Sequence, residues 1–243
     1  MTNPFDTFVK DTKELVLKYP VRHVHEHCKF YAVIVEPRIH PNFEYVCKNV
    51  LRFTDEQWGL HIFHGKDNEA FVKQCLNTVS NVKYTNLEKG NLTIHDYNKL
   101  MTSNDRYHTL IDSEVFLVFQ TDSCLLREGI NEFVQYDYVA APWCESPTDR
   151  GGVVFGNGGL SLRNKDMCMR ICNKYEHKTE SEDMYYSIHM RTEMANLPTR
   201  DKASEFSIEN CTCEKHIPVG IHQRPQNVNH PDFMKNYIEY FQQ

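Results

Sequence analysis

The sequence predicts an α/β fold in which a mainly parallel central sheet is flanked by helices. Apolar, strand-like segments alternate with amphipathic, helix-like segments through the first half of the chain, and this alternation is typical of right-handed βαβ units. The run 115–119 is apolar at every position, as expected of a strand that is buried on both faces of a parallel sheet. It stops abruptly at the polar segment Gln120-Thr121-Asp122.

The first half of the chain supplies the other strands of this sheet. Residues 30–35 are predicted to form an apolar strand that ends before Pro37, because proline cannot continue a central strand. Residues 41–52 are predicted to form a helix, since their apolar side chains recur on one helical face. Further strands are predicted at 60–63 and 82–84, and further helices at 68–79, capped by Asn68, and at 94–101.

The second half is less regular. Residues 138–143 are predicted to form a short strand that runs into a break at Pro142. Five glycines lie within 151–159, which indicates unusual backbone angles or the close approach of a ligand. A short β-like run ends at His222, and helices are predicted at 164–175, 182–194 and 231–241.

The composition excludes several classes of protein. The formal net charge is −6 and no basic run is present, so we expect neither nucleic acid nor an anionic membrane as a partner. No apolar run approaches the ~20 residues of a membrane-spanning helix, and the N-terminus does not resemble a signal peptide. Nine scattered cysteines fit reduced thiols better than a disulfide framework. These observations predict a soluble, cytoplasmic protein of undefined oligomeric state.

Asp122 is the first candidate for chemistry, because it follows the apolar strand directly. Ligands of open α/β sheets collect at the carboxyl ends of the strands, where a carboxylate can hold a divalent cation together with phosphate oxygens. His222 is a second candidate ligand, and the pair would suit Mn²⁺ or Mg²⁺. The alternative is a turn aspartate that only ends a strand.

A second candidate is the segment Ser181-Glu182-Asp183, which opens a predicted helix. Ser181 suits an N-cap position, and carboxylates in the first turn suit the helix dipole. A carboxylate on such a rigid element could instead act as a general base. The residues alone leave both interpretations open.

Other motifs are weaker. The clusters Cys211-Thr-Cys213-Glu-Lys-His216 and 23–28 contain zinc-capable side chains, but neither has the paired spacing of structural zinc sites. The sequence contains no P-loop, no nucleophile elbow and no H-E-x-x-H motif, which argues against the corresponding enzyme classes.

Taken in order, eight segments of the chain resemble GT-A-type nucleotide-sugar glycosyltransferases. The likeness is strongest to short, soluble members found in microbes and large DNA viruses, and it covers roughly residues 29–223. Each segment is weakly specific alone, and the ordered set is specific. The segments are 35–38, 63–65, 119–123, 137–143, 156–163, 182–183, 206–209 and 220–222.

The resemblance implies a site for a nucleotide-sugar donor. The metal-binding D-x-D motif of these enzymes corresponds to 120–122, with Gln120 in place of the first aspartate. The glycine-containing segment 157–159 resembles the loop that shapes the sugar and acceptor pocket. The resemblance implies donor binding by Val35, Glu36, Arg38, His64, Gly65, Gln120, Thr121, Asp122, Asn157, Gly158 and Gly159.

It also implies an activity. Asp122 and the late histidine, His222, would hold Mn²⁺ or Mg²⁺, and Asp183, beside Glu182, would be the catalytic base of an inverting transfer. A divalent cation stabilises the departing diphosphate, and one carboxylate activates the acceptor on the opposite face of the sugar. The expected reaction moves a sugar, most simply UDP-linked, to a hydroxyl of a glycan or glycoprotein.

The resemblance divides the chain into an N-terminal helical extension, 1–28, and a single glycosyltransferase-like domain, 29–243. Within that domain, 29–123 would bind the nucleotide and 124–243 would bind the acceptor and carry the base. One alternative is a non-catalytic member that binds a nucleotide or glycan, which the Gln120 replacement favours. Another is a nucleotidyltransferase, which the segment after the first strand matches poorly.

Overall fold

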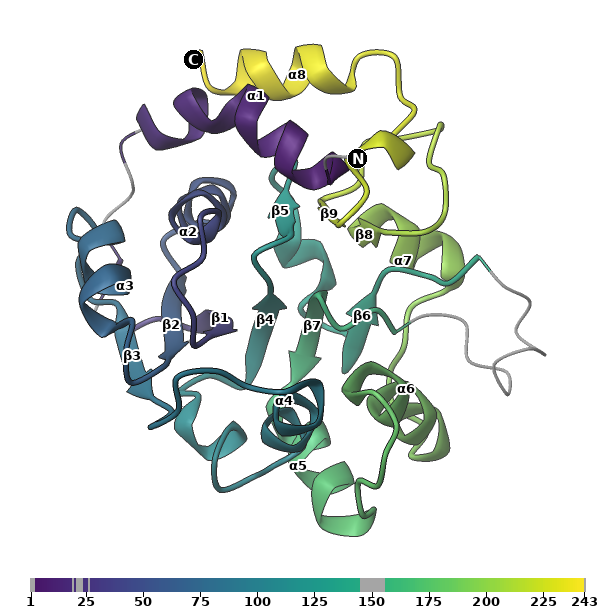
Figure 1. The fold of residues 1–243 in the computed structure, drawn as a ribbon. Coiled ribbons are helices and arrows are strands. Elements are labelled where there is room, and N and C mark those ends of the chain that lie inside the picture. Colours follow the sequence, from purple (N-terminus) through teal and green to yellow (C-terminus); the bar gives the residue numbers. More distant parts are fainter. Residues whose placement is uncertain (1–2, 19, 21–23, 26, 145–155, 243) are drawn as a thin grey trace.

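The computed structural model describes residues 3–18, 20, 24–25, 27–144 and 156–242 (Figure 1). Within them, the main sheet has the strand order β3-β2-β1-β4-β7-β6. Strands β1 to β4 are parallel, and β7 is antiparallel to both of its neighbours. This is the mainly parallel α/β sheet that the sequence predicts. The bounds are β1 Phe30–Glu36, β2 Trp58–His64, β3 Lys83–Asn86, β4 Val115–Phe119, β6 Tyr138–Ala140 and β7 Leu160–Asn164.

The two faces of the sheet carry separate apolar clusters, because successive side chains of a strand point to opposite faces. Ala32 and Ile34 of β1 belong to one cluster, and Tyr31 and Val33 belong to the other. The first cluster includes side chains of α1 (Pro4–Lys18), α2 (Phe43–Phe53), α3 (Glu69–Cys75) and α8 (Phe233–Tyr240). The second includes side chains of α4 (Ile94–Met101).

The outer helices close the fold at its periphery (Figure 1). Helices α1 and α8 lie side by side, with the ring of Phe8 stacked on that of Phe233 at a centroid distance of 6.0 Å. Helices α5 (Lys165–Lys174) and α6 (Glu182–Thr192) pack against each other, and α6 also contacts α4. The remaining helical elements of the described residues are α7 (Arg200–Phe206) and the short 3-10 turns η1 (His108–Leu110), η2 (Ile130–Phe133) and η3 (Pro225–Asn227).

A second, smaller sheet positions the late part of the chain. Strand β5 (Ser123–Leu125) begins directly after the tip of β4 and pairs antiparallel with β9 (Gly220–His222). Strand β8 (Ser207–Ile208) pairs parallel with the other edge of β9. This sheet joins residues that are far apart in the sequence at one end of the main sheet.

Several elements differ from the sequence expectation. Helix α3 ends at Cys75 rather than near 79, since the next residues turn and Asn81 adopts a positive φ of 57°. Strands β5, β7 and β8 and helix α7 were not predicted. Two of the glycines in 151–159, and His23 of the histidine-rich segment, lie outside the described residues.

One cysteine prediction is wrong. Cys144 and Cys211 form a disulfide with Cα atoms 5.2 Å apart, because the segments after β6 and β8 fold onto each other. The other seven cysteines are free thiols. None of the helices in the described ranges is long and apolar enough to cross a bilayer.

Candidate functional site

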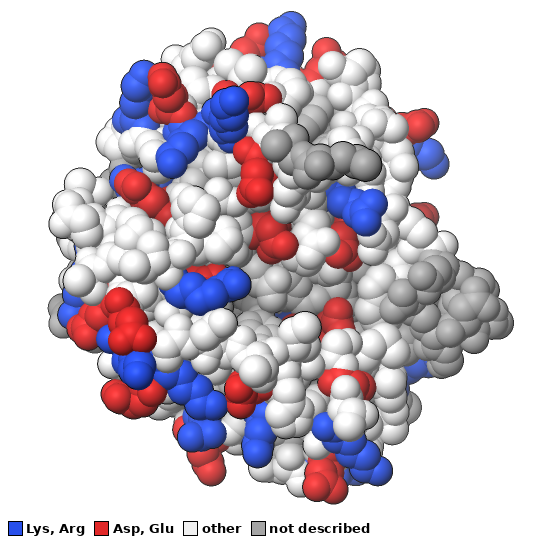
Figure 2. Space-filling view, viewed as in Figure 1, with Lys and Arg blue, Asp and Glu red and all other residues white. Residues whose placement is uncertain are grey.

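A cavity of about 390 Å³ opens at the carboxyl end of the parallel strands. The tips of β1 and β4 form one side, and the segment 91–97 at the start of α4 forms the other. Figure 2 shows a hollow in the middle of this face, with acidic and basic side chains at its rim. Of the residues assigned to donor binding, the cavity is lined by Val35, Glu36, Arg38, Gln120, Thr121 and Asp122.

The tip of β1 is held by a carboxylate–guanidinium fork. Glu36 is buried, and it accepts hydrogen bonds from Nε and Nη2 of Arg38 at 2.9 Å each and from the Arg38 backbone N–H at 2.9 Å. The hydrogen bonds from Arg38 to Glu36 raise the pKa of Arg38. Because half of the Arg38 side chain is exposed, 54%, this cation faces the opening of the cavity, where it could meet a phosphate.

His64 and Gly65 lie behind this wall and do not line the cavity. His64 is buried, and its Nδ1 pairs with the Gly65 carbonyl at 2.8 Å. A Cβ on Gly65 would lie 2.4 Å from the Pro37 carbonyl oxygen, so the glycine permits the close approach of two backbones. Asn68 fixes the same turn, because its amide donates to the carbonyls of Glu36 and Arg38.

Gln120 contacts the opposite side of the cavity. Its amide Nε2 donates to the hydroxyl of Tyr97 at 2.9 Å, which connects the tip of β4 to α4 across the cavity. Burial raises the pKa of Tyr97 above its ordinary value, so its hydroxyl stays protonated. Both side chains line the cavity.

Strand register brings Asp122 and His222 together. Ser123 pairs with His222, and the backbone N–H of Gln223 donates to the Asp122 carbonyl at 2.7 Å. As a result, His222 Nε2 lies 3.2 Å from Asp122 Oδ1. On the opposite side of the ring, His222 Nδ1 lies 3.2 Å from Glu209 Oε1, since Glu209 directly follows β8 where that strand pairs with β9.

The two carboxylates determine the charge of this histidine. Burial works to lower the pKa of His222, but hydrogen bonds to Asp122 and Glu209 outweigh it and raise that pKa to about 9. Burial works to raise the pKa of Asp122, but the hydrogen bond from His222, the charge of His222 and further hydrogen bonds together outweigh it and lower that pKa. Without a metal ion, the imidazolium is thus clamped between two carboxylates.

These donors fit a divalent cation. Two neighbouring ligands around an octahedral cation with bonds of about 2.1 Å lie about 3 Å apart, which agrees with the 3.2 Å between Asp122 Oδ1 and His222 Nε2. In the part of the chain that the structure describes, no three His, Cys, Asp or Glu side chains converge on one point. Diphosphate oxygens and water would complete the shell, as is usual for Mg²⁺.

Gly158 and Gly159 are required by close packing. A positive φ is not the reason, because among the described glycines it occurs at Gly129 and Gly156. A Cβ on Gly158 would lie 2.0 Å from Glu182 Oε1, and one on Gly159 would lie 2.2 Å from His222 Nε2. Asn157 braces this loop, since its Oδ1 accepts from the Gly159 N–H at 3.0 Å.

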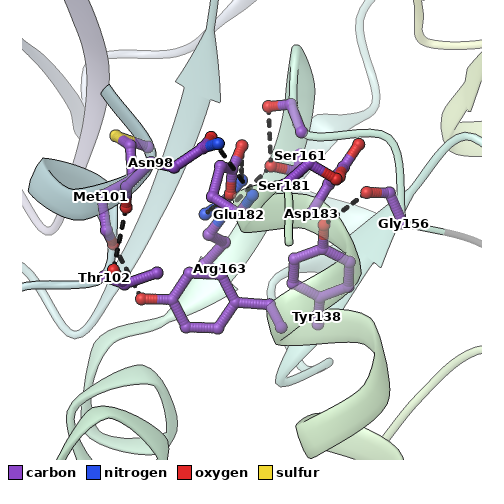
Figure 3. Close-up of polar contacts among 12 residues, drawn as sticks. Asn98, Met101, Thr102, Tyr138, Gly156, Ser161, Arg163, Ser181, Glu182 and Asp183 are labelled. Atoms are coloured by element: carbon purple, nitrogen blue, oxygen red, sulfur yellow. Dashed lines mark hydrogen bonds and ion pairs between the residues drawn. The ribbon is translucent and has the colours of Figure 1, made fainter. Parts of the chain in front are cut away.

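The neighbours Glu182 and Asp183 have different environments (Figure 3). Glu182 faces the fully buried Arg163, with Oε2 2.8 Å from Nη1 and Oε1 3.2 Å from Nη2. Burial raises the pKa of Glu182, and the guanidinium opposes that shift. Asp183 lies apart from this pair and is only half-buried; its Oδ1 accepts from the Met184 N–H at 2.7 Å and from the Ser181 hydroxyl.

One peptide unit separates the two candidate groups. Gly158 is packed against the start of α6, where a Cβ would lie 3.3 Å from that of Asp183, and Gly159 is packed against the ring of His222. Consecutive Cα atoms are about 3.8 Å apart. The site therefore combines a half-buried carboxylate, a closely packed glycine peptide and a candidate cation site.

Sequence reasoning missed several residues of the site. Glu209 lies in the segment 206–209 of the glycosyltransferase resemblance, but the sequence assigned it no function. It directly follows a β-rich segment, which is the same signal that identified Asp122. Tyr97 and Arg163 were missed because nothing local distinguishes them. Their roles depend on partners that are distant in the sequence.

Solved structures share this fold. One is mouse xyloside xylosyltransferase 1 in its apo form, with 10% sequence identity and a TM-score of 0.52. The match covers 82% of this chain and 99% of the xylosyltransferase chain. Another is the galactosyltransferase LgtC in complex with donor and acceptor sugar analogues, with 12% sequence identity and a TM-score of 0.51. The match covers 87% of this chain and 95% of the LgtC chain. A third is a mannosyltransferase from Pyrobaculum calidifontis in complex with GDP-Man and Mn²⁺, with 12% sequence identity and a TM-score of 0.50. The match covers 81% of this chain and 63% of the mannosyltransferase chain. The fold is therefore that of GT-A glycosyltransferases.

Sequence comparison gives the family. No curated protein sequence matches the chain. A family model matches residues 81–222, more than half of the chain and the part that runs from β3 to the end of β9. The chain belongs to the family described as "Protein of unknown function (DUF5672)".

Proposed function

We propose that this protein is a glycosyltransferase that moves a sugar from a nucleoside diphosphate sugar to a hydroxyl group. Asp122 and His222 hold a divalent cation, Mn²⁺ or Mg²⁺, and Asp183 is the general base of an inverting reaction. The donor is most simply UDP-linked, and the acceptor is a glycan or glycoprotein. The glycosyltransferase fold supports this proposal, as do the candidate metal ligands Asp122 and His222 beyond the end of β4.

One observation carries the proposal: the single peptide Gly158–Gly159 lies between Asp183 and the Asp122–His222 pair. Glycosyl transfer needs charge stabilisation on one side of the sugar and proton removal on the other. A sugar lying along this peptide would have its diphosphate on the His222 side and the acceptor on the Asp183 side. The absence of side chains on both glycines lets Glu182 and His222 pack directly against this peptide.

The donor side is built from the cavity walls. Apolar groups of Val35, Pro37 and Leu92 line it and suit the face of a nucleobase. Arg38, held by Glu36, supplies a fixed positive charge at the opening, which favours the diphosphate. When bound, the cation would act as a Lewis acid on that diphosphate.

The acceptor side depends on Asp183. Its Oδ1 is occupied by the Met184 N–H and the Ser181 hydroxyl, so Oδ2 is the oxygen that can take the acceptor proton. Glu182 is a poor base, because it is buried against Arg163 and beneath Gly158. The two neighbours thus have separate roles, one catalytic and one structural.

The test is mass spectrometry of the protein with a panel of nucleoside diphosphate sugars and Mn²⁺. We expect slow release of nucleoside diphosphate from one donor, and no release by Asp122→Ala. Asp183→Asn should bind that donor but lose about 10²–10⁴-fold in rate. The matched control is Asp201→Asn, which removes an exposed first-turn carboxylate of α7 and should leave the rate unchanged.

Two results would contradict the proposal. A product that retains the anomeric configuration of the donor, seen by NMR, would remove Asp183 as the base of an inverting reaction. Calorimetric binding of a donor without any turnover would favour the second candidate, a non-catalytic nucleotide- or glycan-binding protein. The commitment of Gln120 to Tyr97 favours that candidate, because it leaves one carboxylate at the tip of β4.

A further inference from the structure

We propose that Glu209 is a positioning residue that fixes the metal-facing nitrogen of His222 and the acceptor loop at Asn157 with a single carboxylate. This inference rests on the proposed function, because it concerns the same cation site. Glu209 is 8% exposed and directly follows β8. It is not a ligand itself, since it lies on the Nδ1 side of the imidazole, whereas Asp122 lies on the Nε2 side.

Each carboxylate oxygen of Glu209 has its own partner. Oε1 lies 3.2 Å from His222 Nδ1, and Oε2 accepts a hydrogen bond from the Asn157 amide. Both partners are buried, with exposed fractions of 4% and 6%. One buried carboxylate thus bridges the histidine of the candidate cation site and the asparagine of the glycine loop.

Glu209, Asn157, Gly159 and His222 form a ring of successive contacts. Asn157 accepts from the Gly159 N–H at 3.0 Å, and Gly159 packs against the ring of His222. Glu209 is also held from outside: the amide of Asn210 donates to its Oε2 at 3.2 Å, and the amide of Asn227 donates to its carbonyl. A change at Glu209 should therefore move both the imidazole and the loop.

The consequence for the cation follows from the tautomer of the histidine. Glu209 Oε1 lies 3.2 Å from His222 Nδ1, and this negative charge favours a proton on Nδ1 over one on Nε2. The lone pair of a neutral imidazole is then on Nε2, the nitrogen that faces Asp122. A carboxylate behind a ligating histidine orients the ring and raises its basicity, and losing such a partner typically weakens metal binding by about 10–100-fold. Glu209 therefore sets both the affinity for the cation and the position of the peptide beside the sugar.

The experiment measures Mn²⁺ binding in the presence of UDP, with free Mn²⁺ counted by EPR and the imidazole nitrogen detected by electron spin-echo modulation. Glu209→Ala should weaken binding by about 10–100-fold and change the nitrogen coupling. The control is Glu205→Gln on α7, which alters a partly exposed carboxylate paired with Lys202 and should bind Mn²⁺ like wild type.

A paired variant separates positioning from general loss of structure. Glu209→Gln places two amide donors opposite each other at Asn157, so we expect weaker binding. Adding Asn157→Asp restores a donor–acceptor pair between the two side chains, and the double variant should recover the part of the Mn²⁺ affinity that depends on the positions of the imidazole and the loop. Thermal melting of each variant shows that the comparison is made between folded proteins.

The outcomes for the two proposals are distinct. Mn²⁺ affinity of Glu209→Ala within about twofold of wild type, against the 10–100-fold expected, or no recovery in the double variant, would overturn the role of Glu209. Wild-type protein that binds Mn²⁺ and UDP but turns over no donor would overturn the proposed function alone. Wild-type protein that binds no Mn²⁺ would overturn both.

Discussion

The buried pair Arg163–Glu182 gives the sharpest stability prediction. Glu182→Gln keeps the shape of the side chain and removes its charge, which leaves the fully buried guanidinium of Arg163 without its counter-ion. Breaking a buried ion pair on one side typically costs about 3–5 kcal/mol. In a protein of this size, 1 kcal/mol shifts the melting temperature by roughly 2–4 °C, so the expected decrease is about 6–20 °C.

The neighbour on the same helix turn is the comparison. Asp183→Asn removes a half-buried first-turn carboxylate, which is worth about 0.3–1 kcal/mol, so its melting temperature should fall by no more than about 4 °C. The double variant Arg163→Met/Glu182→Leu removes both charges, and replacing a buried pair by apolar side chains is often neutral or stabilising. Its melting temperature should lie well above that of Glu182→Gln.

The assay is thermal unfolding followed by far-UV circular dichroism, repeated with chemical denaturant. A Glu182→Gln variant that melts within about 2 °C of wild type, less than the shift for 1 kcal/mol, would refute the assignment of a buried ion pair. A double variant as unstable as the single one would show that the loss comes from packing under Gly158 rather than from charge.

Three further predictions follow from single contacts. Gly159→Ala should weaken Mn²⁺-dependent UDP binding in calorimetry by at least about tenfold, because its Cβ would collide with the ring of His222. Tyr97→Phe should lower stability by about 1 kcal/mol in denaturant unfolding, because the amide of Gln120 loses its acceptor. Reduction of the Cys144–Cys211 disulfide, which spans 67 residues, should lower stability by about 4 kcal/mol, with nine alkylated thiols by mass spectrometry under reducing conditions and seven without reductant.

Strands β1 and β4 of the parallel part of the sheet could be predicted because they are apolar at nearly every position. The run 115–119 and the helix 94–101 have the predicted bounds in the structure, as β4 and α4. Strand β7 could not be predicted in the same way. It contains Arg163, whose buried charge is compensated by Glu182, which lies against it from another element.

The candidate site was predictable residue by residue but not as a geometry. Asp122 was predicted as a metal ligand because it follows a buried strand, and His222 because of the glycosyltransferase resemblance. In the structure, Asp122 Oδ1 lies 3.2 Å from His222 Nε2. Glu209 lacked a role because only the pairing of the short strands β8 and β9 shows what it faces. The disulfide between Cys144 and Cys211 was missed for the same reason, since their approach depends on tertiary structure.

The small sheet determines when the candidate cation site can form during synthesis of the chain. Residues up to Leu125 can form the parallel strands and the cavity walls, but His222 reaches Asp122 only when β9 pairs with β5. That pairing has a large separation in sequence, and such contacts form slowly because the intervening chain must first be ordered. Under the proposed function, a ribosome-bound chain that ends before 220 would lack a complete cation site, so metal affinity would appear only once most of the chain has emerged.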